Sequence, residues 1–270
     1  MRDGKVVADG AALDFDRERL IEAMGGAEAR PTTAAVAERA ANENAPVMVS
    51  ARPAGQQGGH ELIAREGEVI GLAGLAAHGQ TRLLIDVFRA AHRRQAGVSV
   101  AAPVALVAGD RQTDGVFPLW SIGDNIAVRS LKTLRRGLFI AADREKALAK
   151  HWQKRIGIRT PDLGNSILSL SGGNQQKALF ARALGSDARI VLMDDPMRGV
   201  DVGTKLEVYD LIRAEAAAGR TFLWYTTETE ELSNCDRVYV FRNGQIVATL
   251  DRDELSEEKI IQSSFAEAVS

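Results

Sequence analysis

The chain has 270 residues, of which 45% are hydrophobic and 26% are charged, as in an ordinary globular protein. Its formal net charge of −2 argues against an extended nucleic-acid surface or a polybasic membrane patch. Cys235 is its single cysteine, which excludes an intramolecular disulfide and a cysteine-cluster metal site. No apolar run reaches the roughly 20 residues that span a bilayer, and the first residues lack a signal-peptide core. We therefore expect a cytoplasmic protein whose membrane contact comes through a partner.

The start of the chain repeats a segment near its end. Residues 1–8, MRDGKVVA, align without gaps with residues 241–248, FRNGQIVA. Each copy indicates two strands joined by an Asp-Gly or Asn-Gly hairpin turn, with a short helix after it. The repeat predicts that residues 1–27 are the tail of a preceding domain of the same kind. Residues 28–46 show no periodic apolar face, which is typical of a linker.

An α/β pattern begins at residue 47. The stretch 68–73 predicts a buried strand, which leads through a glycine-rich turn to a helix at 81–85. Residue 105 begins a second short strand. Leu148, Trp152 and Ile156 fall at helical spacing, so we expect a helix-rich segment over about 117–170. Three more strands follow, at 189–194, 221–225 and 237–241. Together these elements predict a mostly parallel sheet with a helical insertion between two of its strands.

The turn after the first predicted strand has the frame of a phosphate-binding loop, G-x-x-x-x-G-K-[ST]. In such a loop, glycines let backbone N–H groups surround phosphates, a helix begins behind them, and a lysine and a hydroxyl serve the phosphates and Mg²⁺. A glycine-rich turn before a helix is common, and a plain strand-to-helix turn is the alternative. The candidate ATP-binding residues are Gly74, Leu75, Ala76, Ala77, His78, Gly79, Gln80 and Thr81.

Residues 170–177 read LSGGNQQK. This run resembles the signature sequence of ABC transporter ATPases, in the form found in importers of simple sugars. A serine and two glycines at a helix start offer a hydroxyl, backbone N–H groups and a positive dipole end to an anion. The alternative is an ordinary capped helix. The candidate nucleotide contacts in this run are Ser171, Gly172, Gly173 and Gln175.

Residues 190–203, IVLMDDPMRGVDVG, resemble the acidic strand end and the following loop of the same family. The resemblance assigns Asp194 and Thr81 to Mg²⁺ and makes Asp195 the catalytic acid, with Thr227 at the position of a switch histidine. Loop, signature and acid occur in the family's order. We therefore expect the α/β fold of a P-loop NTPase of the ABC type over 47–270, with the helical subdomain inserted between the phosphate loop and the signature.

The resemblance also implies cofactors and partners. In fused sugar importers of this family, two such domains close head to tail, with each ATP between one phosphate loop and the other domain's signature. The expected cofactors are ATP and Mg²⁺. The expected partners are another nucleotide-binding domain, an integral membrane permease and, indirectly, a periplasmic solute-binding protein, with no nucleic acid. The expected location is the inner face of the cell membrane.

This chain departs from the family pattern mainly around its own phosphate loop. Gln80 replaces the loop lysine, Ala77 replaces a glycine, and Asp195 is one methylene shorter than the usual glutamate. Thr227 replaces the histidine, and Gly109 falls where a glutamine or glutamate would reach metal and water. No aromatic residue lies between residues 46 and 68 to stack on adenine. The signature keeps every family residue.

These departures predict an ATP-binding component of a sugar importer that supplies its signature to a partner domain's ATP. Its own site is expected to be degenerate, and the isolated chain to hydrolyse ATP slowly or not at all. The main rival is a non-hydrolysing interaction or regulatory relic of an ABC ATPase. A DNA-repair or translation ATPase of the same superfamily would not explain the sugar-type signature.

Overall fold

The computed structural model describes residues 6, 8–11 and 44–265. The predicted preceding-domain tail over 1–27 and the linker over 28–46 lie almost wholly outside the described residues. The body of the molecule begins with the strand that follows Pro46. Within the described residues no helix is both long enough and apolar enough to cross a bilayer.

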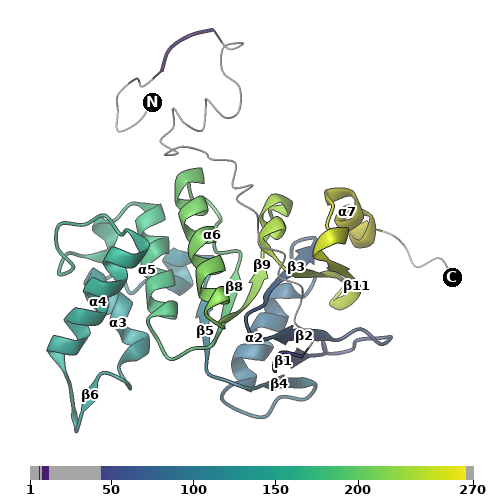
Figure 1. Cartoon of the computed structure of the whole chain (residues 1–270), viewed down its shortest axis with the longest axis horizontal. Helices are drawn as coiled ribbons and strands as arrows, with labels where there is room; N and C mark the ends of the chain where they lie inside the picture. Colours follow the sequence, from purple (N-terminus) through teal and green to yellow (C-terminus); the bar gives the residue numbers. More distant parts are fainter. Residues whose placement is uncertain (1–5, 7, 12–43, 266–270) are drawn as a thin grey trace.

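A six-stranded sheet in the order β11-β10-β3-β9-β8-β5 forms the centre of the molecule (Figure 1). The strands β10, β3, β9, β8 and β5 pair in parallel, and only β11 pairs antiparallel, with β10. Near-continuous apolar runs form these strands because both faces of the sheet are covered. The predicted mostly parallel sheet is confirmed. Its strands are β3 (Val69–Gly74), β5 (Val104–Val107), β8 (Ile190–Asp194), β9 (Thr221–Tyr225), β10 (Arg237–Arg242) and β11 (Gln245–Asp251).

A second, antiparallel sheet in the order β2-β1-β4 was not anticipated from the sequence. It consists of β1 (Val47–Ala51), β2 (Leu62–Arg65) and β4 (Val98–Val100). Helix α2 (Gln80–Ala90) contacts both this sheet and the central one. Its buried residues Leu83, Leu84 and Val87 belong to a core that includes side chains of both sheets. This packing fixes the direction in which α2 leaves the glycine-rich turn.

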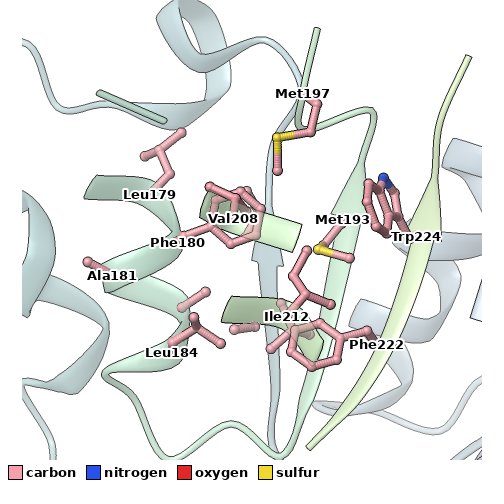
Figure 2. Close-up of a cluster of buried hydrophobic side chains, with 14 of the residues drawn as sticks. Leu179, Phe180, Ala181, Leu184, Met193, Met197, Val208, Ile212, Phe222 and Trp224 are labelled. Atoms are coloured by element: carbon pink, nitrogen blue, oxygen red, sulfur yellow. The ribbon is translucent and has the colours of Figure 1, made fainter. Parts of the chain in front are cut away.

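The other face of the central sheet is covered by α5 (Gly172–Leu184) and α6 (Val202–Ala217). Figure 2 shows Phe180 and Leu184 of α5 beside Val208 and Ile212 of α6, with Phe222 and neighbouring strand residues beneath them. Burial of this apolar cluster anchors the start of α5 relative to the strands. An ion pair between buried Lys177 and Glu207 also joins the two helices.

The segment over 117–170 contains α3 (Ile122–Ala127) and α4 (Ala142–Ile156), which pack beside α5 (Figure 1). In α4 the predicted helical spacing is confirmed, since Trp152 and Ile156 are buried and Leu148 packs against the core. Short 3-10 turns at Val128–Ser130 and Ile167–Ser169 flank these helices. The segment also holds a small hairpin, β6 (Arg135–Arg136) and β7 (Phe139–Ile140), which the sequence did not predict. That residues 117–170 form a separate subdomain stays a prediction.

The hairpin of the second repeat copy forms as expected. Asn243 and Gly244 connect β10 to β11 with φ angles of 51° and 80°. Two consecutive residues with positive φ are typical of the tight turns that Asn-Gly favours. A 3-10 turn at Arg252–Glu254 and helix α7 (Glu257–Phe265) follow, as predicted for this copy. The first copy lies mostly outside the described residues.

Candidate functional site

The phosphate loop joins the end of β3 to the start of α2. Its backbone has positive φ at Gly74 (122°), Ala77 (65°) and Gly79 (106°). Glycine adopts such angles freely, whereas a Cβ makes them unfavourable, so Ala77 is strained in the way its departure from the family pattern suggested. Leu75, Ala76 and His78 complete the loop. The local backbone therefore keeps the curled shape of a phosphate loop despite the substitutions.

The side chain of Gln80 folds back into this loop. Only 1% of the residue is exposed, and its Nε2 donates to the carbonyl oxygens of Ala73, at 3.2 Å, and Leu75, at 3.1 Å. Its Oε1 is buried without a hydrogen-bond partner. The amide thus ties the two ends of the loop together but brings no positive charge to it. A buried carbonyl oxygen without a partner is unfavourable for stability.

The turn between β10 and β11 packs against the same loop. The N–H of Gly244 donates to the carbonyl oxygen of His78 at 3.0 Å. A Cβ added to Gly79 would lie 2.9 Å from Gly244 Cα, and one added to Gly74 would lie 2.3 Å from the Phe241 carbonyl oxygen. Both loop glycines are thus required by close backbone packing as well as by φ. The sequence signalled the turn through its Asn-Gly pair but not this contact.

The two predicted Mg²⁺ residues lie together. Thr81, in the first turn of α2, donates from Oγ1 to Oδ1 of Asp194 at 2.6 Å. Asp194 ends β8, so the central sheet and α2 bring a hydroxyl and a carboxylate to one point. Burial raises the pKa of Asp194, as do the negative charges of Asp195 and Asp114, while the hydrogen bond from Thr81 opposes them. A divalent cation at this pair would relieve the unfavourable burial of the carboxylate.

The two predicted catalytic residues bond to each other. Asp195 accepts from Thr227 Oγ1 at 3.1 Å and from the Thr227 N–H at 3.3 Å. Asp195 has a positive φ of 49° and is only 9% exposed. Both oxygens of its carboxylate are therefore held by Thr227. An acid that positions an attacking water must have an acceptor site directed at that water, and Thr227 occupies one acceptor site on each oxygen.

Backbone contact explains the glycine at position 109. A Cβ added to Gly109 would lie 2.2 Å from the carbonyl oxygen of Asp194 and 3.3 Å from that of Asp195. Atoms at such distances overlap, so no larger residue fits without movement of the acidic strand end. The absence of a larger side chain at position 109 is therefore tied to the backbone path of residues 194–195. The next residue, Asp110, caps the single π-helical turn Arg111–Gly115 by accepting from backbone N–H groups.

The signature residues form the start of α5. Ser171 is the N-cap, and its Oγ accepts from the N–H and the Nδ2 of Asn174, at 3.4 and 3.0 Å. Gln175 is buried and donates from Nε2 to the Leu170 carbonyl oxygen at 3.0 Å. These hydrogen bonds stay within the segment and order its backbone. The predicted capped helix is thus present, and its N-terminal dipole end carries two glycines.

Close packing surrounds both signature glycines. A Cβ at Gly173 would lie 3.0 Å from Asp201 Oδ2 and 3.0 Å from Thr204 Oγ1. At Gly172 the neighbour is a guanidinium: a Cβ there would lie 2.7 Å from Nη2 of Arg111. Arg111 also approaches the Arg198 carbonyl oxygen, at 3.5 Å. Arg111 was not predicted from the sequence, where it follows directly after Gly109 and Asp110.

Some features of the described residues fit the implied cofactors, Mg²⁺ and ATP, and others do not. Thr81 and Asp194 present the oxygen ligands that Mg²⁺ prefers. The loop backbone and the start of α2 suit a phosphate in shape. The loop cation is missing, and Asp195 is engaged by Thr227. The described residues therefore fit Mg²⁺ and a phosphate in shape and oxygen ligands, and they offer no lysine at position 80. Among the residues of known placement, no group of three or more His, Cys, Asp or Glu side chains could hold another metal ion.

Comparison of sequences places this chain among known proteins. The ABC transporter family matches residues 59–198. The ribose import ATP-binding protein RbsA 2 of Burkholderia ambifaria is 33% identical over 98% of this chain and 56% of its own length. The ribose import ATP-binding protein RbsA 3 of Rubrobacter xylanophilus is 34% identical over 97% of this chain and 55% of its own length. The chain thus spans little more than half the length of these relatives.

Solved structures share the fold. The dimeric structure of MJ0796, described as a bacterial ABC transporter cassette, superposes with a TM-score of 0.61 at 18% identity, covering 76% of this chain and 99% of that one. A nucleotide-free ATP-binding cassette from an ABC transporter gives a TM-score of 0.65 at 18% identity, covering 82% of this chain and 99% of that one. At this identity the likeness concerns the arrangement of helices and strands.

Proposed function

The chain belongs to the ABC transporter family of ATP-binding domains, and from this premise we propose that it is a component of an importer for a simple sugar or similar solute. In this proposal the start of α5 binds the γ-phosphate of ATP held by a partner domain, through Ser171, Gly172 and Gly173. The chain's own phosphate site binds Mg²⁺-ATP weakly and contributes little hydrolysis. The ribose importers among its relatives support the solute class.

One contrast carries this proposal. The signature residues keep their family identities, and Ser171 and Gln175 make hydrogen bonds that order their own segment. Around the phosphate loop, by contrast, Gln80 supplies no charge and Asp195 is held by Thr227. A helix N-terminus that carries glycines is suited to stabilising negative charge on a phosphoryl group. The chain is therefore better equipped to assist a neighbouring ATP than to hydrolyse its own.

An exposed apolar cluster supports a membrane permease as a further partner. Phe117 and Trp120 stack with ring centroids 4.6 Å apart, and Leu119 between them is 96% exposed. Exposed apolar clusters of this kind mark interaction sites. In the proposed assembly this cluster contacts the permease at the inner face of the membrane, and a periplasmic solute-binding protein delivers the solute from the other side.

The proposal is tested by comparing variants in a complex with a competent partner domain, meaning one whose own phosphate loop binds and hydrolyses ATP. Ser171→Arg places a long cationic side chain where the partner's phosphate would lie, and turnover should be lost almost completely. Gln80→Ala changes only this chain's own loop and should leave most of the turnover. The measurement is phosphate release by the complex, with thermal melting of each variant as the folding control. A larger loss with Gln80→Ala than with Ser171→Arg would show that this chain's own site does the hydrolysis.

Two further measurements separate the proposal from the rival of a regulatory relic. The isolated chain should release phosphate far more slowly than about 1 s⁻¹ at saturating Mg²⁺-ATP, below ordinary enzyme turnover. With the competent partner, ATP should drive association of the two domains, and Ser171→Arg should prevent it. ATP-driven association that is insensitive to Ser171→Arg, with turnover unchanged, would favour the relic.

A further inference from the structure

The hairpin β6–β7 presents large apolar side chains to solvent. Arg135 pairs with Ile140 and Arg136 with Phe139, and the turn between them begins at Gly137 with a φ of 64°. Leu138 is 88% exposed and Phe139 is 79% exposed. In Figure 1 the hairpin, labelled β6, projects at the lower left beyond α3 and α4. Exposure of this kind is unfavourable in water unless a partner covers it.

The same segment carries an excess of positive charge. No acidic residue occurs between Asp124 and Asp143, whereas four basic residues do. One of these, Arg129, donates to the Val104 carbonyl oxygen. The other three, Lys132, Arg135 and Arg136, are exposed, and within the described residues they form no ion pair. This local excess is invisible in the net charge of −2.

We propose that this hairpin binds the surface of a membrane containing anionic phospholipids. Leu138 and Phe139 enter the headgroup layer, and the basic side chains of Lys132, Arg135 and Arg136 contact lipid phosphates. Apolar side chains flanked by basic ones are the combination that interfacial membrane segments use. The proposal revises the expectation from composition that all membrane contact comes through a partner.

The size of the hairpin favours lipid over protein as the partner. A stable protein interface takes about 20–30 residues from each side, and this tip offers three apolar side chains, Leu138 in the turn and Phe139 and Ile140 on β7. Insertion into a headgroup layer needs no matching surface. Each basic residue near an anionic surface should strengthen binding about fivefold, so three of them make a weak but measurable contact. The contact does not involve the nucleotide residues.

Vesicle flotation with the full chain tests this inference. Vesicles of phosphatidylcholine alone are compared with vesicles that contain about one-third phosphatidylglycerol. We expect at least about tenfold stronger binding to the anionic vesicles, with loss at high salt because the charges are exposed. Leu138→Ser combined with Phe139→Ser should reduce that binding about tenfold. Arg135→Gln combined with Arg136→Gln should reduce it about 25-fold, at about fivefold for each charge.

Matched controls keep the outcome decisive. Leu168→Ser removes an exposed apolar side chain elsewhere, and Arg144→Gln with Lys146→Gln removes two exposed charges on α4. Both controls should bind the anionic vesicles like the unmodified chain, and circular dichroism should show that all variants fold. Equal binding to neutral and anionic vesicles would overturn the proposal, as would hairpin variants that bind like the controls. Hairpin variants that keep vesicle binding but lose a permease would assign the hairpin to protein contact instead.

Discussion

The phosphate loop and the start of α5 are both glycine-containing helix starts, yet their polar side chains are used in opposite ways. Around the loop, Thr81 bonds to Asp194 and Asp195 bonds to Thr227, so the expected catalytic and metal residues satisfy one another. At α5 the side chain of Ser171 orders the first turn only. The comparison shows that close backbone packing can preserve the shape of a glycine-rich motif even where its polar side chains bond to one another.

The largest expected effect concerns the backbone crowding at Gly109. Gly109→Ala would place a Cβ against the Asp194 carbonyl oxygen and should lower the free energy of unfolding by about 2–3 kcal/mol, as overpacking does. Urea denaturation measures it. Gly59→Ala is the control, since a Cβ there meets no atom within 4 Å. If the two variants were equally stable, the missing glutamine would be a simple side-chain loss and the loop could regain it.

A cation restored to the phosphate loop should make the loop, like the start of α5, suited to binding phosphate. Gln80→Lys should tighten Mg²⁺-ATP binding by about tenfold or more, because a charge-assisted hydrogen bond to phosphate contributes roughly 1.4 kcal/mol or more. Hydrolysis should stay low, since Asp195 and Thr227 are unchanged. Nucleotide titration measures the affinity, with Gln80→Met as the uncharged control. Equal affinities for all three proteins would mean that the loop does not contact phosphate.

Replacing Arg111 tests whether a second segment helps to hold the signature residues in position at the start of α5. Its guanidinium lies against Gly172, and Arg111→Ala should lower turnover in the complex with a competent partner about fivefold, equivalent to roughly 1 kcal/mol. Gln112→Ala, one residue later and exposed, is the control. Phosphate release by the complex is the measurement. Unchanged turnover with Arg111→Ala would leave the start of α5 independent of this contact.

The smallest effect concerns the strained loop backbone. Ala77→Gly should raise the free energy of unfolding by about 0.5–1 kcal/mol, because glycine adopts the positive φ of 65° without strain. The neighbouring Ala76 has no positive φ, so Ala76→Gly should lower stability slightly. Urea midpoints of the two variants provide the comparison. Destabilisation by both would mean that Ala77 is not strained in solution.

Much of the fold could be predicted from local pattern. The strand before the phosphate loop, the acidic strand, the helix after the signature and the Asn-Gly turn all appeared where expected. Each depends on short-range requirements, namely apolar runs, a capping serine and residues that allow positive φ. The small sheet β2-β1-β4 escaped prediction, and its strand β4 has only three residues and pairs with β1 across about 50 residues. The β6–β7 hairpin escaped because each strand has only two residues.

The candidate site, like the fold, could be predicted only in part. The identities of the predicted site residues, including Gln80, Asp195 and Thr227, could be read from the sequence by itself. Only the tertiary structure decided what those side chains do, because the partners of Asp195 and Thr81 lie 32 and 113 residues away along the chain. The strands β3, β9 and β8 are neighbours in the sheet, so the segments that follow their carboxyl ends lie close together. Hydrogen bonds between distant segments depend on that arrangement, which no local pattern encodes.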